Sequence, residues 1–226
     1  MTVASRGSGR VDPSTVAIWI AWGVVWWLLW QLGLRSWRKL WPRPRPGWLG
    51  RGLLDRLRPV IWPSDRLVDW IGPRPGMQVI EASAGTERLT DLLVRAVGSS
   101  GQVVAIDERL DVVEALQRTA LTNGQSTLTV LHSPATLLPA EPASMDLVVL
   151  TSVFGGAPDP TAIVTEAIRV LRPGGMLAVS EFLVDADYSL ASTVVTHMVL
   201  AGFGIERERG GLLGYTVIGR KPGYGV

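Results

Sequence analysis

Two acidic residues, Glu81 and Asp107, each stand at the end of an apolar stretch that predicts a buried strand. After Glu81 the chain enters a run of small residues, 82–85, that can turn tightly. Leucine, alanine and valine then recur at helical spacing between residues 89 and 97, before the second apolar stretch ends on Asp107. A tight turn, a helix and a carboxylate about 20 residues further on are typical of sites for adenosine-containing cofactors. The turn lets the backbone approach the ligand, and the carboxylate accepts from the ribose hydroxyls.

Residues that could take a proton from a substrate are few. Glu181 is expected to end a later strand, at the edge where parallel strands hold their ligands, and His197 falls within an expected helix. Each residue also has a structural explanation, Glu181 as a solvated acid at a strand end and His197 as a structural histidine in an apolar run. No metal site is indicated, because the chain has no cysteine and its two histidines, His132 and His197, are far apart in sequence.

Alternating strand and helix patterns must position these residues. The alternation predicts an α/β fold with a doubly wound, mostly parallel sheet that has helices on both faces. Two C-terminal strands that flank Gly210 and Gly211 predict an antiparallel hairpin at one edge of that sheet. Ser64 and Asp65 are expected to cap the first helix of this domain. The helices are expected over residues 66–71, 89–97, 109–122, 160–171 and 189–200. The strands that follow Asp107 are expected over residues 127–132, 146–152 and 176–184.

Several segments, in order along the chain, resemble the motifs of class I S-adenosylmethionine-dependent methyltransferases, in the type 11 branch that is similar to ubiquinone and menaquinone methyltransferases. These segments are residues 66–76, 76–107, 145–150, 166–175, 201–203 and 212–222. Together they cover roughly residues 62–222. The resemblance implies a seven-stranded class I methyltransferase-like sheet, and S-adenosylmethionine as the cofactor if the site is functional.

The resemblance assigns cofactor contacts to Glu81, Ser83, Gly85, Asp107 and Glu108. In the family pattern an acidic residue is followed by three glycines at alternate positions. Only the acid, Glu81, and the central glycine, Gly85, match that pattern here.

Three positions depart from the family pattern and imply a degraded cofactor site. Ser83 and Glu87 replace glycines, and Pro134 stands where the family has an aspartate that contacts the adenine amino group. A carboxylate of Glu87 at about 5 Å from the carboxylate of the cofactor would weaken binding by roughly 3 kcal/mol at an effective dielectric constant of about 20. The alternative is that Glu87 turns outward and only favours the N-terminus of its helix. The loop after the fourth strand also lacks a histidine that is often found there in relatives that methylate ring carbons or hydroxyls.

The N-terminal part of the chain differs from the rest in composition. Residues 1–14 form a polar tail, and residues 35–61 form a basic juxtamembrane linker rich in tryptophan and proline, ahead of the methyltransferase-like domain over residues 62–226. Between tail and linker, residues 15–34 carry no charge and one amide, Gln31. At about 1.5 Å per residue such a helix is long enough to cross the hydrocarbon core of a membrane. We therefore expect a retained single-pass transmembrane helix over residues 15–34.

The distribution of charge sets the expected orientation and partners. Residues 35–60 carry a net charge of +7, whereas residues 61–226 carry −6. On the N-terminal side of the apolar segment, the positively charged residues are only Arg6 and Arg10. The positive-inside rule therefore predicts an inner-membrane protein with its N-terminus outside and its C-terminal domain in the cytoplasm. A basic segment beside an acidic domain favours membrane lipids as a partner and argues against nucleic acid.

Four tryptophans in the apolar segment, Trp19, Trp22, Trp26 and Trp30, fall along one face of the expected helix. They are interpreted either as a bulky stripe that faces lipid or as a flat surface that packs on other transmembrane subunits, quinones or pigments.

Three hypotheses about function follow from the sequence. The first is a non-catalytic accessory or structural subunit of a larger membrane complex, photosynthetic or respiratory, because Ser83, Glu87 and Pro134 depart from the family pattern. The second is an active methyltransferase that acts on a lipid-soluble substrate such as a quinone precursor. The third is a module that binds a different nucleotide or a lipid in the same crevice.

Overall fold

The computed structural model of the chain describes residues 13–40, 63–82, 85, 87–183, 185, 188–211 and 213–223. The chain divides into two compact units, Met1–Pro44 and Arg45–Val226, and each is considered by itself. Most of the predicted tail and most of the predicted linker lie outside the described residues.

The described part of the first unit is a helix, α1 (Pro13–Leu40), whose interior contains no proline. Trp19, Trp22, Trp26 and Trp30 are all exposed on it, and the rings of Trp26 and Trp30 stack with their centroids 6.3 Å apart. Across the part of the chain that the structure describes, no helix combines the length and the apolar character needed to cross a membrane. The transmembrane segment expected over residues 15–34 is therefore not confirmed.

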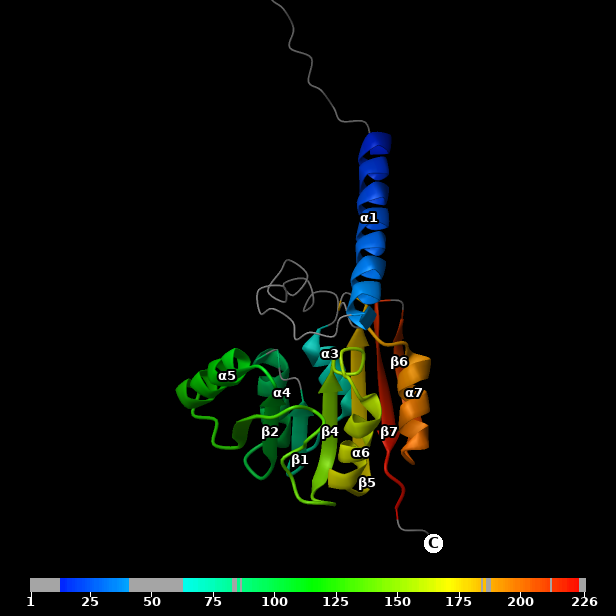
Figure 1. Cartoon of the computed structure of the whole chain (residues 1–226). Helices are drawn as coiled ribbons and strands as arrows, with labels where there is room; N and C mark the ends of the chain where they lie inside the picture. Colours follow the sequence, from blue (N-terminus) through cyan, green and yellow to red (C-terminus); the bar gives the residue numbers. More distant parts are fainter. Residues whose placement is uncertain are drawn as a thin grey trace, which may run out of the picture. The chain divides into compact units, whose positions relative to one another are not determined.

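The second unit is built on a seven-stranded sheet with the strand order β3-β2-β1-β4-β5-β7-β6 (Figure 1). Neighbouring strands from β3 to β5 are parallel. β7 is antiparallel to both β5 and β6, which confirms the predicted hairpin at one edge of a mostly parallel sheet. The strands are β1 (Gln78–Ala82), β2 (Gln102–Asp107), β3 (Leu128–His132), β4 (Met145–Thr151), β5 (Leu171–Phe182), β6 (Gly204–Gly211) and β7 (Gly214–Arg220).

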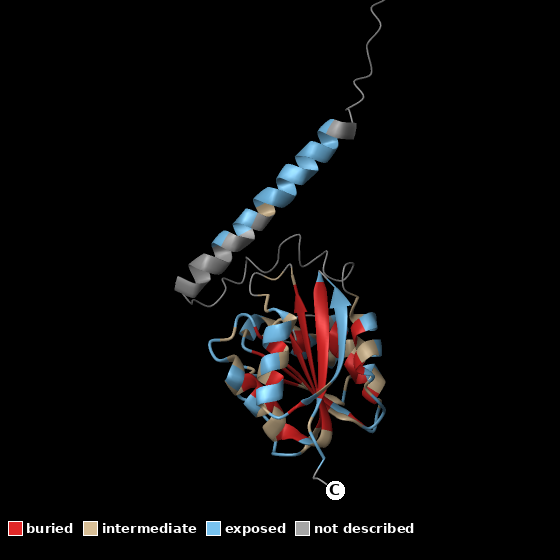
Figure 2. Ribbon diagram, turned by 90° about the vertical axis from the view of Figure 1, so that its right-hand side faces the viewer, coloured by how far each residue is buried: buried red, intermediate tan, exposed pale blue. Residues whose placement is uncertain are grey.

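Helices cover both faces of this sheet, as the alternation of elements predicts. The helices on the first face are α3 (Ser64–Ile71), α4 (Glu87–Val97) and α5 (Leu110–Thr122), and those on the second face are α6 (Pro160–Val170) and α7 (Ala191–Leu200). Successive strand residues point to opposite faces, so Val79 packs on α3 and α4 while Ile80 packs with the cluster that contains α6 and α7. Figure 2 shows the result: buried residues fill the inner strands, whereas the edge strand β6 and the outer sides of the helices are exposed.

Two predicted helix starts have different outcomes. α3 begins at Ser64, with Pro63 at its N-cap, so the expected caps at Ser64 and Asp65 are wrong. Asp65 instead lies in the first turn and pairs with Arg88 of α4 at 2.7 Å. α6 begins where the sequence predicts, because Asp159 accepts from two backbone N–H groups of its first turn and Pro160 follows directly.

β5 begins five residues earlier than the sequence pattern indicates. The Arg172–Gly175 run, expected as a turn between α6 and the strand, lies within β5. Backbone hydrogen bonds between the glycines and Lys221 hold it there, from Gly174 N at 2.9 Å and to Gly175 O at 2.8 Å. The glycines fit a strand because a distant segment pairs with them, which local sequence does not reveal.

Candidate functional site

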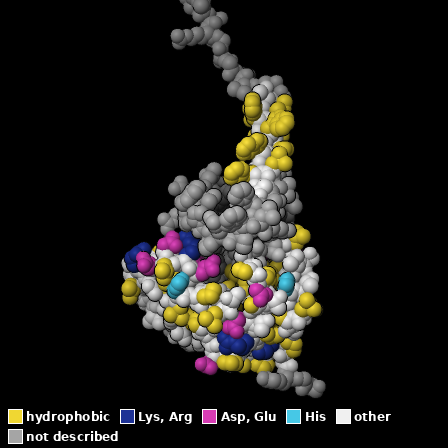
Figure 3. Space-filling model, in the orientation of Figure 1, with side chains coloured by type: hydrophobic (Ala, Val, Ile, Leu, Met, Phe, Trp, Pro, Cys, Tyr) yellow, Lys and Arg dark blue, Asp and Glu magenta, His cyan; other side chains and the backbone are white. Residues whose placement is uncertain are grey.

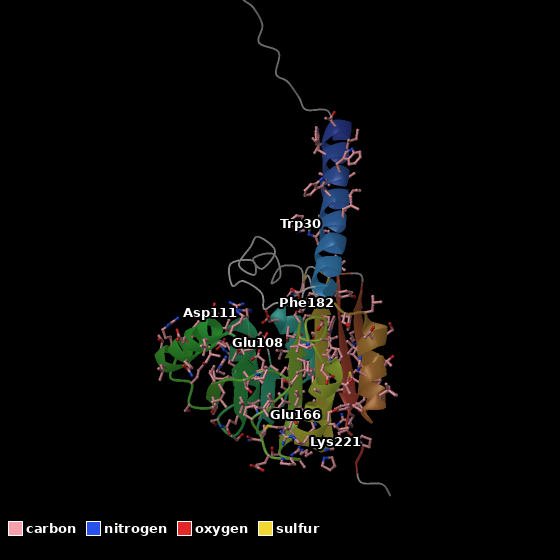
Figure 4. All side chains as sticks on the ribbon, viewed as in Figure 1. Trp30, Glu108, Asp111, Glu166, Phe182 and Lys221 are labelled. Carbon is pink, nitrogen blue, oxygen red and sulfur yellow. The ribbon has the colours of Figure 1, made fainter. Side chains whose placement is uncertain are left out.

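The parallel strands β1 to β5 place their carboxyl ends at one edge of the sheet. The strand order reverses between β1 and β4, so that β1 has β2 on one side and β4 on the other. In open α/β sheets, ligands bind outside the carboxyl ends of the strands at such a reversal. Figure 4 shows Glu108 and Phe182, from the ends of β2 and β5, toward this edge, and Glu166 and Lys221 toward the opposite edge.

Glu81 lies on β1 at this reversal, with Ala105 of β2 and Val149 of β4 as its neighbours in register. It points to the face covered by α4, and its side chain is buried. Burial raises the pKa of the Glu81 carboxyl to about 8, the nearby hydroxyl of Thr90 opposes part of the rise, and the charge of Asp107 adds to it. The carboxyl of Glu81 is therefore mostly protonated at neutral pH.

Asp107 ends β2 beside the site of Glu81 and is also buried. Its carboxylate accepts a hydrogen bond from the backbone N–H of Arg109 at 2.9 Å, which fixes the start of the loop into α5. Burial raises the pKa of Asp107, and the contact with Arg109 opposes the rise. The next residue, Glu108, is exposed, and its backbone carbonyl lies 2.9 Å from Nε2 of His132.

Buried polar atoms without a partner gather on the same face. Within the residues that the structure describes, Glu81 Oε2, Thr90 Oγ1 and Thr151 Oγ1 are buried and form no hydrogen bond of good geometry, although the Thr90 hydroxyl is close enough to Glu81 to oppose the rise in its pKa. Thr151 ends β4 and is in register with Ser180 of β5. Leaving buried polar groups unpaired is unfavourable by roughly 1–3 kcal/mol for each. Atoms left unpaired in this way are typical of a site that is completed by a polar ligand.

Some of the predicted cofactor residues lie at this edge of the sheet. Glu81, Asp107 and Glu108 all stand at it, and Gly85 is exposed in the turn between β1 and α4. Ser83 lies outside the described residues. Glu87 is the first residue of α4, but its side chain is not described, so its predicted repulsion of the cofactor stays a prediction.

Pro134 belongs to a turn that closes on itself after β3. Its carbonyl accepts from the backbone N–H of Leu137 at 3.0 Å, and the hydroxyl of Ser133 donates to the carbonyl of Leu137 at 2.6 Å. Proline supplies no carboxylate and no N–H here, so this turn offers a ligand fewer polar groups than the family pattern implies.

Glu181, the first catalytic candidate, is fully buried, so the interpretation as a solvated strand-end acid is wrong. Its two oxygens accept from the backbone N–H groups of Phe154 at 2.9 Å and Ser189 at 3.4 Å. Burial raises the pKa of Glu181 to about 7, these two hydrogen bonds oppose the rise, and the charge of Asp185 adds to it. Glu181 therefore ties the loop after β4 to the segment before α7.

His197, the second candidate, lies half-buried on α7 and is not brought to Glu181 directly. Its ring makes an edge contact with Phe154 at a centroid distance of 5.8 Å, and its Nδ1 lies 3.4 Å from the hydroxyl of Thr161. These contacts join α6 to α7 and agree with the structural interpretation of this histidine.

One residue at the carboxyl edge was missed by sequence reasoning. Ser152, directly after β4, has a φ of 55°, a left-handed conformation that is uncommon for serine. Its backbone N–H donates to Ser180 O at 2.8 Å, and its hydroxyl donates to the carboxylate of Asp185. Such strain recurs at functional sites, but no sequence signal marks it, because serine occurs in every kind of loop.

Known proteins that are similar in sequence to this chain include methyltransferases. Residues 80–179 match the family model described as "Methyltransferase domain". The demethylmenaquinone methyltransferase of Staphylococcus aureus is 33% identical over 135 residues, which cover 56% of this chain and 54% of that protein. The ubiquinone/menaquinone biosynthesis C-methyltransferase of Cereibacter sphaeroides is 30% identical over 123 residues, covering 54% of this chain and 48% of that protein. The chain thus spans about half the length of the curated relatives it matches.

The fold is also similar to that of a solved methyltransferase. A solved S-adenosylmethionine-dependent methyltransferase from Aquifex aeolicus superposes with a TM-score of 0.66 at 19% identity, covering 82% of this chain and 97% of that one. The chain is a methyltransferase-fold protein, with the seven-stranded mixed sheet of that fold. Its homologues include quinone methyltransferases.

Proposed function

We propose that this chain is an S-adenosylmethionine-dependent methyltransferase whose substrate is a lipid-soluble quinone precursor. The observation that carries the proposal is the buried Glu81, whose Oε2 has no hydrogen-bond partner among the described residues, beside Asp107 at the reversal of strand order. The homology to quinone methyltransferases supports the reaction class and the substrate class.

The donor set fits the cofactor in charge. When bound, S-adenosylmethionine supplies a methyl group activated by its positive sulfonium. The charge of Asp107 helps to raise the pKa of Glu81, and a cationic group bound beside the two residues would favour the ionised form of Glu81. Asp107 would accept from the ribose hydroxyls and Glu81 from the amino group of the cofactor. The exposed Gly85 has no side chain, so the backbone of the turn can approach the ligand.

The acceptor side lies toward the ends of β4 and β5. Glu181 is fully buried and engaged by two backbone N–H groups, so its role is to position the Phe154 loop rather than to remove a proton. Methyl transfer depends mainly on the alignment of the acceptor atom with the methyl group, and the fixed loop contributes to that alignment. Ser152 of this loop donates from its hydroxyl to Asp185 of the segment after β5, so both are polar side chains at this edge.

The alternative of a non-catalytic subunit has no support from the three relatives described above, which are methyltransferases. The partners and the location of the chain stay predictions. The exposed tryptophans of α1, each more than half accessible, support the proposal that this helix contacts lipid or partner helices.

Calorimetric titration of S-adenosylmethionine and S-adenosylhomocysteine into the full-length chain tests the binding step. We expect micromolar affinity for the wild type and a loss of about tenfold or more in Glu81→Gln, because glutamine keeps the shape but cannot ionise to the carboxylate that accepts from the amino group of the cofactor. Glu114→Gln, an exposed change on α5, is the matched control and should bind like the wild type. A folded wild type that binds neither compound at millimolar concentration overturns the proposal.

Transfer of a labelled methyl group to demethylmenaquinone tests the substrate class separately. We expect turnover with the quinone precursor and none with a water-soluble catechol of similar ring chemistry. Tight cofactor binding without transfer to the quinone would keep the cofactor assignment and remove the substrate assignment.

A further inference from the structure

A second polar site lies at the opposite edge of the sheet, where the parallel strands begin. A cavity of about 440 Å³ opens there beside the start of β4 and β5 and the end of β7. Four arginines line it: Arg74, Arg172, Arg207 and Arg220. The expected cofactor residues Glu81, Gly85, Asp107 and Glu108 do not line this cavity, although several segments that resemble methyltransferase motifs do.

Two of the four arginines already have carboxylate partners. Arg172 pairs with the buried Asp146 at 2.5 Å. Arg220 makes a two-pronged contact with Glu206 and also donates to the carbonyl of Gly174 at 2.6 Å. The second oxygen of Asp146 accepts from the backbone N–H of Gln78 at 2.7 Å, so the acids at this edge are neutralised.

The other two arginines are not neutralised. Arg74 and Arg207 are both exposed, and neither forms an ion pair within the described part of the chain. The cavity therefore carries an excess of two positive charges. On the face drawn in Figure 3, basic side chains stand beside acidic ones both at the lower edge and at the upper left of the domain.

Three apolar side chains form part of the cavity wall. Ile71 and Met176 are buried beneath it, and Met77 is half-buried at its side. Gly72 and Gly174 line it with bare backbone, and an added Cβ at either residue would meet no atom within 4 Å. A small apolar group can therefore rest on Met77, the one of these three side chains that is partly accessible.

We propose that this cavity binds a phosphate monoester that carries an apolar group. A phosphate monoester holds between one and two negative charges at neutral pH, which matches the excess charge of Arg74 and Arg207. The planar guanidinium forms paired hydrogen bonds with phosphate oxygens, and the apolar part of the ligand covers the partly accessible Met77. The phosphate belongs either to the headgroup of an anionic lipid or to a soluble phosphate ester.

Calorimetry on the full-length chain with three probes tests the site and separates the two sources. The probes are dioctanoyl phosphatidic acid, its neutral counterpart dioctanoyl phosphatidylcholine, and glycerol 3-phosphate. We expect the phosphatidic acid to bind and the phosphatidylcholine not to bind. Tighter binding of the phosphatidic acid than of glycerol 3-phosphate assigns the site to lipid, and equal binding assigns it to soluble esters.

Matched variants locate the binding. The double variant Arg74→Gln with Arg207→Gln should weaken binding at least tenfold, because each arginine contributes charged hydrogen bonds. Arg118→Gln removes one exposed charge from α5 and should leave affinity within twofold of the wild type. The single charge reversal Arg207→Glu serves if the double variant unfolds. Equal affinity in these variants and the control, or no binding of any phosphate probe to the wild type, overturns the proposal.

Binding of S-adenosylmethionine measured on the same variants keeps this site separate from the carboxyl edge. It should be unchanged by both arginine substitutions. A parallel loss of both ligands would show that the variants damage the fold, and Arg207→Glu with an unchanged unfolding midpoint would then decide the assignment.

Discussion

Glu81 and Glu181 are both buried at the carboxyl edge of one sheet, yet they point to its opposite faces. Glu81 shares its face with Val79, which packs on α3 and α4, whereas Glu181 shares its face with Val179, which packs with residues of α6 and α7. Within the described residues, Glu81 keeps an oxygen without a partner, and Glu181 has a backbone donor on each oxygen. The residue proposed to bind the cofactor, Glu81, and the residue proposed to position the Phe154 loop, Glu181, therefore lie on different faces of the sheet.

Glu81 should make stability fall as the pH rises. Its pKa is about 8 in the folded chain and near 4.5 when unfolded, so between these values the folded chain holds a proton that the unfolded chain has released. The stabilisation is fully present below pH 4.5 and is lost as the pH rises through 8. Glu81→Gln removes the effect, so the variant should gain on the wild type by a few kcal/mol between pH 5 and pH 9. Urea unfolding at both values measures this gain, and a constant difference would contradict the burial of Glu81.

Glu181→Ala should destabilise the domain by roughly 2–4 kcal/mol, because it leaves the N–H groups of Phe154 and Ser189 buried without their acceptor. Glu181→Gln keeps one amide oxygen as an acceptor and should lower the free energy of unfolding by less. Affinity for S-adenosylmethionine should change little in Glu181→Gln. A loss of that affinity as large as in Glu81→Gln would place Glu181 in the cofactor site and contradict its positioning role.

Arg169 joins α6 to the loop between β3 and β4. It pairs with Glu166 at 2.8 Å and donates to the carbonyls of Ala140 at 2.9 Å and Leu138 at 3.0 Å. Arg169→Ala should lower the free energy of unfolding by roughly 1–3 kcal/mol, since those carbonyls lose a charged donor. Arg118→Ala, whose carboxylate partner is 3.9 Å away and exposed, should change it by less than about 0.5 kcal/mol. Equal unfolding midpoints in the two variants would contradict the role of Arg169.

Gly101 sits where β2 begins against the end of α4. An added Cβ would lie 2.6 Å from the Cβ of Val97 and 2.7 Å from the carbonyl oxygen of Met77, and neither backbone can yield freely. Gly101→Ala should therefore destabilise the domain by roughly 1–3 kcal/mol. Gly204→Ala is the control, because its nearest neighbour would be 3.9 Å away. Thermal unfolding of the pair checks the prediction, and a stable Gly101→Ala would mean that α4 lies further from β2.

The sequence by itself determined the order of elements and, to within two residues, where the parallel strands end. Glu81 and Asp107 could be located because an apolar strand followed by an acid and a tight turn is a local pattern. The same local logic places Asp159 and Pro160 at the start of α6. These features depend on neighbours within a few residues, which a single sequence displays.

Only the tertiary structure decided which of these groups are buried, which face they occupy and what they touch. Glu181 is buried because the loop after β4 and the segment before α7 close over it, and both are distant in sequence. β5 starts at Leu171 because Lys221 pairs with its glycines. The arginine cavity joins residues from 71 to 220, so its excess charge arises only when the sheet brings those segments together. Burial and electrostatic balance depend on such distant neighbours, and no local pattern encodes them.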